Sequence, residues 1–388
     1  MNIELLGSTW GHERGYGPLI GLNQFHRDLF PASVKWSVRS LEAFGDHSLE
    51  DLANNFDLVI FDHPFIGEIA EKKLLLPLDE YLEESFLNDL SINAIGNSYD
   101  SYVWKENIYA LPIDVAGHVS ARRADLFEKY GLSTPRSWDE VLDLAKETKY
   151  SKGSMVAIPG FSVDLWCLFI TISANRGVIP YSQRGKFVPR EHGELVFKYI
   201  KELSDLSPRD SMTWNPIETL DAMSSRDEFI YTPALFGYSN YSKDNFRKSR
   251  IIFGELPDSG SGSRGGILGG AGIGVSAKSK HPNEAVKVAQ VLSSPEIQRG
   301  LYVEFGGQPG HRSAWVDEMN NLKTSNFYLN TLDTLQKSYL RPRIPGFVGV
   351  QTKSSEVIWK TIHNQISVPE ALESLDKIYL DACNLFDD

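Results

Sequence analysis

The stretch IYALPIDVAGHVSARRADLFEKYGLSTPRSWDEVLDLAK, from Ile108 to Lys146, is the segment around which the rest of the chain can be arranged. It predicts a short turn and a strand carrying the acid Asp114, then a second strand, then two helices. Gly131 suits the left-handed position that closes a helix. Ser137 and Glu140 have the spacing of a capping box, and apolar residues follow them at helical intervals. This segment therefore predicts mixed α/β structure.

Length and composition predict a globular protein of two domains. The chain has 388 residues, too many for one compact core, with 41% hydrophobic and 23% charged residues. No segment is long and apolar enough to span a bilayer. The formal net charge of −12 argues against nucleic acid as a partner, because phosphate binding needs a concentrated basic surface.

The cysteines and the amino terminus say little about the compartment. Cys167 and Cys383 lie far apart in the sequence, so we expect two small buried hydrophobic residues, not a disulfide. The chain starts with the strand-like MNIELLG, which lacks the basic and apolar regions of a signal peptide. For an exported protein we expect that Met1 replaces a removed signal; a protein made without one is the alternative.

The first 65 residues alternate between strand and helix. Strands are predicted at Ile3 to Leu6, around Val34 to Val38 and at Phe56 to Phe61, with helices between them. This is the layout of a parallel α/β sheet, in which ligand-facing loops lie at the carboxyl ends of the strands. The loops in question are residues 8–14 and 62–65.

Five short motifs, taken in order, are similar to those of one protein family. They are Tyr109 to Asp114, Leu126 to Leu132, Ser137 to Glu140, the strand end at Leu256 and Pro257, and Arg341 to Pro345. Their order resembles the extracellular solute-binding proteins of ABC importers, and within these the carbohydrate-binding family 1 type. Each motif alone is degenerate, and only the order is specific.

The resemblance implies an α/β, two-lobed, periplasmic-binding-protein-like fold of type II with a hinge between the lobes. The predicted N-terminal lobe is residues 1–112 plus 264–312, and the predicted C-terminal lobe is residues 113–263 plus 313–388. The implied function is capture of a small carbohydrate-like solute by hinge closure and its delivery to ABC transporter permease subunits. The implied ligand is a sugar, oligosaccharide, polyol or sugar acid. A periplasmic or extracytoplasmic monomer without a cofactor is expected.

Catalytic and metal-binding motifs are missing from the sequence. It has no G-x-S-x-G elbow, no H-E-x-x-H and no closely spaced Cys/His set. The glycine-rich stretch from Gly265 to Gly274 lacks both the P-loop and the dinucleotide-binding spacing. It predicts either a flexible crossover with close backbone packing or a direct ligand contact through the backbone amides of Gly269 and Gly270.

A polyhydroxylated ligand needs a flat aromatic surface for the C–H face of its ring, and planar side chains that both donate and accept hydrogen bonds. We expect such side chains at strand ends and in the hinge segment. The ligand-binding candidates are Trp10, His12, Asp62, His63, Asp114, His118, Trp166, Tyr238, Asn240, Tyr241, Gly270 and Arg312.

Candidates in the predicted strand-end loops and hinge segment each have a structural alternative. Trp10 follows the first strand, and its ring either binds ligand or is buried, while His12 in the same loop binds or is solvated. Asp62 binds ligand or caps the next helix. Asp114 binds ligand or makes a structural hydrogen bond in the hinge, and for His118 a satisfied, half-buried histidine is the alternative.

Candidates later in the chain are open in the same way. Trp166 lies at the start of an apolar helix, where core packing competes with binding. Tyr238, Asn240 and Tyr241 form the best polar and aromatic cluster of the second lobe. Arg312 follows a Gly-Gly-Gln-Pro turn, where a structural salt bridge competes. Because several of these side chains could clamp a carboxylate, a sugar acid stays among the ligands.

Two other function classes remain open at this point. One is an α/β carbohydrate-active enzyme that uses Asp62 and Asp114 as a carboxylate pair. The other is a sensory binding module that docks a receptor in place of a permease. Turnover of a sugar would support the enzyme, and stoichiometric binding without product would support a binding protein.

Overall fold

The chain forms two compact units. The computed structural model describes residues 3–40, 48–151, 153–260 and 265–387. The first unit consists of Met1–Ala116, Gly269–Leu322 and Arg341–Gly346. The second unit consists of Gly117–Leu268, Lys323–Leu340 and Phe347–Asp388.

The boundaries of the two units differ from the predicted lobe boundaries. Residues 113–116, 313–322 and 341–346 belong to the first unit, and residues up to 268 belong to the second. The first change of unit falls between Ala116 and Gly117, inside the strand Leu111–Arg122, where no break in secondary structure marks the boundary. That the units act as lobes closing on a ligand stays a prediction.

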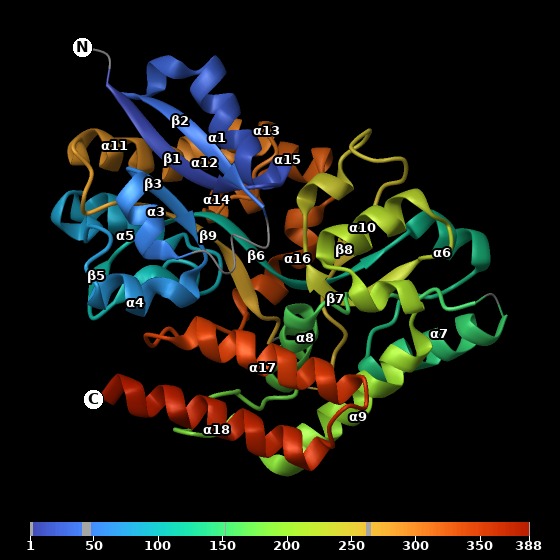
Figure 1. Ribbon diagram of the computed structural model, residues 1–388. Helices are drawn as coiled ribbons and strands as arrows, with labels where there is room; N and C mark the ends of the chain where they lie inside the picture. The colour runs from blue at the N-terminus through green and yellow to red at the C-terminus, as the bar shows by residue number, and fades with distance from the viewer. Residues whose placement is uncertain (1–2, 41–47, 152, 261–264, 388) are drawn as a thin grey trace. The chain divides into compact units, whose positions relative to one another are not determined.

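A mixed sheet organises the first unit (Figure 1). Strand β1 (Glu4–Trp10) pairs in parallel with β2 (Ser33–Arg39) and β3 (Leu58–Phe61), as predicted. Strand β9 (Leu268–Val275) returns antiparallel to β3. The next strand in the order is β6 (Leu111–Arg122), whose first half lies in this unit. The carboxyl ends of β1 and β3 therefore meet at one edge.

Helices cover this sheet and complete the unit. A short antiparallel ribbon, β4 (Val103–Trp104) with β5 (Asn107–Ile108), precedes β6. The helices with residues in the first unit are α1 (Glu13–Phe25), α3 (Leu49–Asn55), α4 (Ile66–Glu71), α5 (Glu84–Ile92), α11 (Pro282–Ser293), α12 (Pro295–Arg299), α13 (Leu301–Glu304), α14 (Arg312–Trp315) and α15 (Glu318–Lys323).

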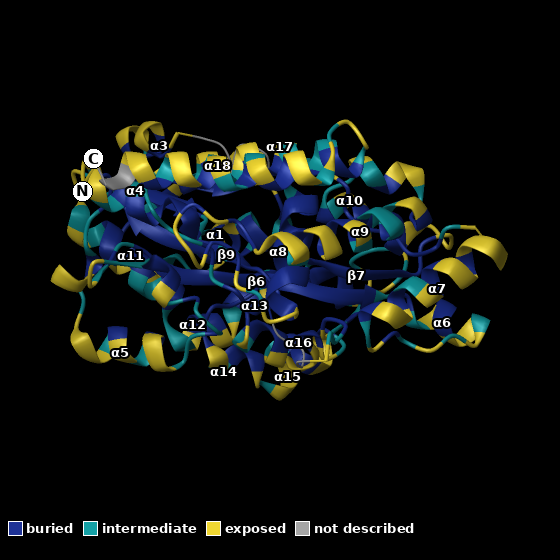
Figure 2. Ribbon diagram, turned by 90° about the horizontal axis from the view of Figure 1, so that it is seen from below, coloured by how far each residue is buried: buried dark blue, intermediate teal, exposed yellow. Residues whose placement is uncertain are grey.

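The second unit is built on the other half of β6. It pairs antiparallel with β7 (Tyr231–Phe236) and with β8 (Ile252–Gly254). The surrounding helices are α6 (Ala124–Tyr130), α7 (Trp138–Ser151), α8 (Ser162–Asn175), α9 (Arg190–Leu206), α10 (Pro216–Ser225), α16 (Phe327–Gln336), α17 (Phe347–Ile362) and α18 (Val368–Asp387). Strands β6 and β7 are buried, whereas α7 and α18 expose one face to solvent (Figure 2).

Most local signals of the segment from Ile108 to Lys146 are confirmed. Gly131 closes α6 with φ +65° in the left-handed region. The Ser137 hydroxyl accepts a hydrogen bond from the Glu140 amide at 3.2 Å, while the Glu140 carboxylate accepts from the Arg136 amide. One prediction is wrong, because β6 is a single strand of twelve residues where two strands were expected.

Two large apolar side chains on helices are exposed. Phe25 is 64% exposed and stacks on Phe305 with ring centroids 5.9 Å apart, and Leu195 on α9 is 44% exposed. The buried state of Cys167 and Cys383 is confirmed, and both are free thiols. Part of the predicted glycine- and serine-rich loop, residues 261–264, lies outside the described residues. In the part that is described, no helix could cross a membrane.

Candidate ligand-binding site

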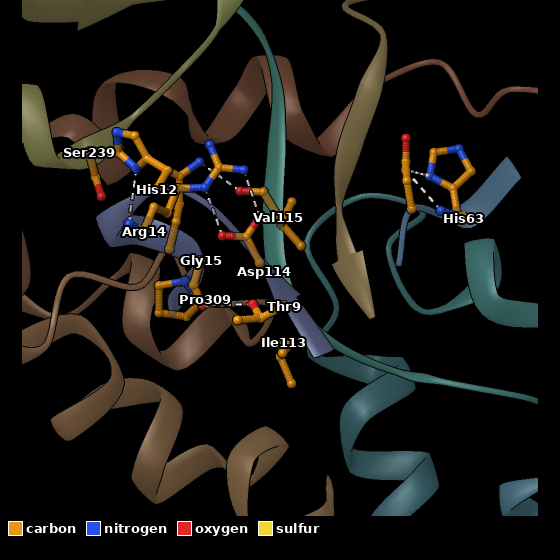
Figure 3. A network of polar contacts seen from close by, with 12 residues as sticks. Thr9, His12, Arg14, Gly15, His63, Ile113, Asp114, Val115, Ser239 and Pro309 are labelled. Atoms are coloured by element: carbon orange, nitrogen blue, oxygen red, sulfur yellow. Dashed lines mark hydrogen bonds and ion pairs between the residues drawn. The ribbon is translucent and has the colours of Figure 1, made fainter. Parts of the chain in front are cut away.

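A buried ion pair joins the first turn of α1 to β6 in the first unit. The guanidinium of Arg14, in the first turn of α1, donates two hydrogen bonds to the Asp114 carboxylate, from Nε at 2.8 Å and from Nη2 at 2.7 Å (Figure 3). Both side chains are buried. Burial raises the pKa of Asp114 and the Arg14 charge lowers it, with a net rise. Both Asp114 oxygens are therefore engaged by a residue that the sequence interpretation missed.

The same loop packs Trp10 and His12 together. Trp10 is only 3% exposed, and its ring stacks on His12 at 6.1 Å, with the Arg14 guanidinium 5.1 Å from the Trp10 ring. Gly15 makes room for the indole, since a Cβ there would lie 2.5 Å from it. His12 Nδ1 accepts a hydrogen bond from the Arg14 amide and so caps α1. These contacts support the burial alternative for Trp10 and give His12 a capping role.

A second charged cluster follows β3. The Asp62 carboxylate accepts hydrogen bonds from the His63 amide at 2.8 Å and from Arg341 Nη2 at 2.9 and 2.6 Å. His63 Nδ1 lies 3.0 Å from Asp62 Oδ1. His63 and Arg341 are buried, but the Asp62 side chain is 21% exposed. Asp62 therefore caps the turn and keeps a partly exposed side chain, and its contact with a ligand stays a prediction.

Electrostatics fix the charge state of this cluster. Burial alone would raise the pKa of Asp62, but the charges of Arg341 and His63 lower it, and the net pKa is well below the usual range. Burial, together with the Arg341 charge, lowers the pKa of His63 to about 4. At neutral pH the cluster is therefore an ionised Asp62, a cationic Arg341 and an uncharged His63.

Asp62 and Asp114 both influence the pKa of one phenol, that of Tyr102. Burial raises the pKa of Tyr102, and the charges of Asp62 and Asp114 raise it further. The Tyr102 hydroxyl donates to the Phe61 carbonyl oxygen at 3.3 Å. Asp62, directly after β3, and Asp114, near the start of β6, therefore belong to one electrostatic neighbourhood.

Gly270 lies on β9, and Arg312 begins α14. Gly270 has φ +125°, and a Cβ there would lie 2.3 Å from the Asp114 carbonyl oxygen, so it serves close packing of β9 on β6. This supports the crossover alternative for the glycine-rich stretch. Arg312 is exposed at the first position of α14.

In the second unit, three predicted residues are held by internal contacts. His118 Nδ1 lies 2.9 Å from the Thr171 hydroxyl. Trp166 is fully buried, and its Nε1 donates to the Tyr181 hydroxyl at 3.1 Å. The Tyr241 hydroxyl donates to Asp221 Oδ1 at 2.7 Å. These contacts support the structural alternatives for His118 and Trp166 and give the Tyr241 hydroxyl an internal partner.

Tyr238 and Asn240 are buried where β7 runs into a loop. Asn240 follows the strand in a short 3-10 turn, Ser239–Ser242. Its Oδ1 atom is buried and accepts no hydrogen bond from the described residues. Of the predicted cluster in this unit, Asn240 thus keeps hydrogen-bonding capacity.

The sequence interpretation missed a buried acid in the same unit. Asp164 is the third residue of α8 and is 6% exposed. An acid at this position commonly bonds back to the amide before the helix, but here the Phe161 amide donates to the Trp214 carbonyl oxygen at 3.0 Å. Burial, with the nearby charge of Glu218, raises the pKa of Asp164 to about 8. The only sequence signal was an acid inside the first turn of an otherwise apolar helix.

No group of three or more His, Cys, Asp and Glu side chains in the described ranges could hold a metal ion. The residue clusters described above provide hydrogen-bonding groups and charges. Comparison with known proteins identifies the protein family in which they occur. A family model described as bacterial extracellular solute-binding protein matches residues 48–299, more than half of the chain.

The chain belongs to this family.

Solved structures share the fold of this solute-binding protein along its whole length. Maltose-bound MalE3 of T. maritima is 19% identical with a TM-score of 0.84, and the match covers 99% of this chain and 100% of that chain. A ribitol complex of an ABC transporter solute-binding protein from Agrobacterium radiobacter K84 is 17% identical, with a TM-score of 0.82 and 99% coverage of both chains. The GacH receptor of Streptomyces glaucescens, solved unliganded and with acarbose, is 14% identical, with a TM-score of 0.81 and coverage of 100% and 99%.

These matches confirm the predicted two-lobed, periplasmic-binding-protein-like α/β fold class. Family membership also confirms that this is a solute-binding protein of the kind that the five motifs indicated. Within the first unit the fold brings together Trp10, His12 and Asp114 in one cluster, and Asp62 with His63 in another.

Proposed function

We propose that this solute-binding protein captures a small carbohydrate-like solute and delivers it unchanged to the permease subunits of an ABC transporter. The expected place of action is outside the cytoplasmic membrane, and the expected form is a monomer. Support for the ligand class comes from proteins of the same fold, whose structures contain maltose, D-tagatose, ribitol and D-mannitol.

The observation that carries this proposal is the Asp62 carboxylate. It is charged, partly exposed, and fixed in place by Arg341 and the His63 ring at the carboxyl end of β3. A carboxylate whose orientation is fixed by neighbouring side chains can accept hydrogen bonds from two adjacent hydroxyls without reorganising, which favours a sugar or polyol as the ligand. We assign Asp62 as the main ligand acceptor of the first unit.

Ligand binding couples to closure of the two lobes only if the ligand interacts differently with the open and closed forms. We propose that the Asp62 carboxylate of the first unit provides one polar contact for this purpose. A micromolar dissociation constant needs a net of about 8 kcal/mol, which a few charge-assisted hydrogen bonds and apolar contacts supply.

The enzyme alternative finds little support in the carboxylates. A retaining or inverting glycosidase needs one acid that can donate a proton and a second that can act as base or nucleophile. Both Asp114 oxygens accept hydrogen bonds from Arg14 instead. We therefore favour binding without turnover.

A thermal-shift screen tests the proposed function. The panel is maltose, D-tagatose, ribitol, D-mannitol and D-galacturonate, because a ligand selective for the folded protein raises its melting temperature with concentration. At least one uncharged member should stabilise the protein. Asp62→Asn should require at least tenfold more of it, while Asp28→Asn, an exposed acid of the same unit, should behave as wild type. A panel without any stabilising member would contradict a carbohydrate ligand.

A further inference from the structure

The buried acidic and basic side chains of the described residues form ion pairs, with one exception. Among the described residues, the buried Asp, Glu, Lys and Arg side chains are Arg14, Asp114, Arg123, Asp164 and Arg341. Arg14 pairs with Asp114 at 2.7 Å, Arg123 with Asp125 at 2.7 Å, and Arg341 with Asp62 at 2.6 Å. No cationic side chain in the described part of the chain forms an ion pair with Asp164. An ionised buried acid without a counter-ion is costly, so the charged form of Asp164 would gain from a cationic partner that the described residues do not supply.

The surroundings of Asp164 increase that cost. The amide that would bond back to it, that of Phe161, is used by the Trp214 carbonyl oxygen. Its charged neighbour is Glu218, whose carboxylate accepts a hydrogen bond from the Asn215 amide as part of the α10 capping box. The field at Asp164 is thus negative, and the group that would neutralise it is a cation.

Asp164 lies on a definite face of α8. Thr171 is seven residues further along, about two helical turns, and therefore on the same face. The Thr171 hydroxyl contacts His118 Nδ1 at 2.9 Å and accepts from the Ile267 amide at 3.2 Å. This face of α8 is thus turned toward β6 and the crossover that leads into β9, the part of the second unit nearest to its boundary along the chain.

We propose that Asp164 is the recognition group for a basic nitrogen on the ligand, so that the preferred ligand is an amino or imino sugar. This inference rests on the proposed function and narrows its ligand class. An ammonium or secondary amine would supply the missing positive charge and a charge-assisted hydrogen bond. The charges of the Arg14 and Arg341 pairs cancel, so neither pair offers a sugar acid an unmatched cation.

Binding of a protonated amine at Asp164 must displace a proton. Because burial holds the pKa of Asp164 near 8, the free protein carries a proton on this carboxyl at neutral pH. A ligand whose nitrogen is already protonated displaces that proton, which passes to the buffer, and the carboxylate then faces the ammonium. Binding should therefore release about one proton at pH 6–7, whereas an uncharged sugar should release none.

Isothermal titration calorimetry with matched probes tests the inference. The pairs are D-glucosamine against D-glucose and 1-deoxynojirimycin against D-glucose, titrated at pH 6.0, where both amines are mostly protonated, in two buffers of different ionisation enthalpy to count released protons. In at least one pair, the nitrogen-containing member should bind tenfold or more tightly and release about one proton. Asp164→Asn should abolish both the preference and the proton release. Asp143→Asn, an exposed acid of the same unit, should change neither.

The outcomes separate this inference from the proposed function. Binding of the uncharged probes with no gain from the nitrogen, or a gain that persists in Asp164→Asn, overturns the role of Asp164 and leaves carbohydrate binding intact. Failure of every carbohydrate, charged or not, overturns both. If Asp164→Asn does not fold, the proton count on the wild-type protein decides alone.

Discussion

Replacing Asp164 by Asn should stabilise the ligand-free protein, and the gain should grow with pH. The pKa of Asp164 is raised from about 4 in the unfolded chain to about 8 by burial and by Glu218. Between these values the folded protein keeps a proton that the unfolded chain has lost, so this group lowers stability by about 1.4 kcal/mol for each pH unit of rise. From pH 5 to pH 7 the loss is about 2–3 kcal/mol, and it stops above pH 8.

The asparagine variant has no such titration, because its amide is uncharged throughout this range. Urea unfolding of both proteins at pH 5, 6, 7 and 8 should therefore show a variant that is the more stable at every pH. Its advantage in the free energy of unfolding should grow by about 2–3 kcal/mol from pH 5 to pH 7. The exposed-acid variant Asp143→Asn should follow the wild type at every pH. A stability difference that stays constant from pH 5 to pH 8 would refute the assignment of Asp164 as a buried acid without a counter-ion.

Three further predictions concern the other clusters. Arg14→Met leaves Asp114 buried without its cation and should lower the free energy of unfolding in urea by about 3–5 kcal/mol. The double variant Arg14→Met with Asp114→Leu should recover most of this loss. If the losses of the two single variants add up in the double variant, the pairing is contradicted. Asp62 should cause no change in ligand affinity between pH 7 and pH 5. The reason is that Arg341 helps to hold the Asp62 pKa well below this range, so the carboxylate stays ionised. A titration of Asp62 inside this range, observed by carboxyl NMR, would contradict this prediction. Tyr241→Phe should cost about 1 kcal/mol and leave affinity unchanged, whereas a tenfold loss of affinity would return Tyr241 to the ligand site.

The segment from Ile108 to Lys146 was informative because its signals are local. A glycine at a left-handed position and a serine three residues before a glutamate specify helix ends whatever surrounds them, and both operate at Gly131 and Ser137. The order of the motifs then led to the family, which no single residue could have done. The unbroken strand β6 was missed because turn-like Pro112 and Gly117 are accommodated within it.

The candidate site was predictable in position more than in detail. Loops after β1 and β3 were expected at one edge because parallel strands end together, and Asp62 lies in one of these loops, whereas Asp114 lies inside β6. The partners of these two acids, Arg14 and Arg341, could not be inferred, because pairing across 100 and 279 residues leaves no local pattern. Asp164 escaped notice for a similar reason, since an acid in the first turn of a helix ordinarily indicates a cap.

The most direct test of this account is calorimetric titration of the wild-type protein with the best ligand from the thermal-shift screen, followed by mass spectrometry of the recovered ligand. The account predicts saturable binding of one ligand per chain, at least tenfold weaker in Asp62→Asn, and a ligand recovered with its mass unchanged. Conversion of the ligand into a product, or equal binding by the Asp62→Asn variant, would contradict it.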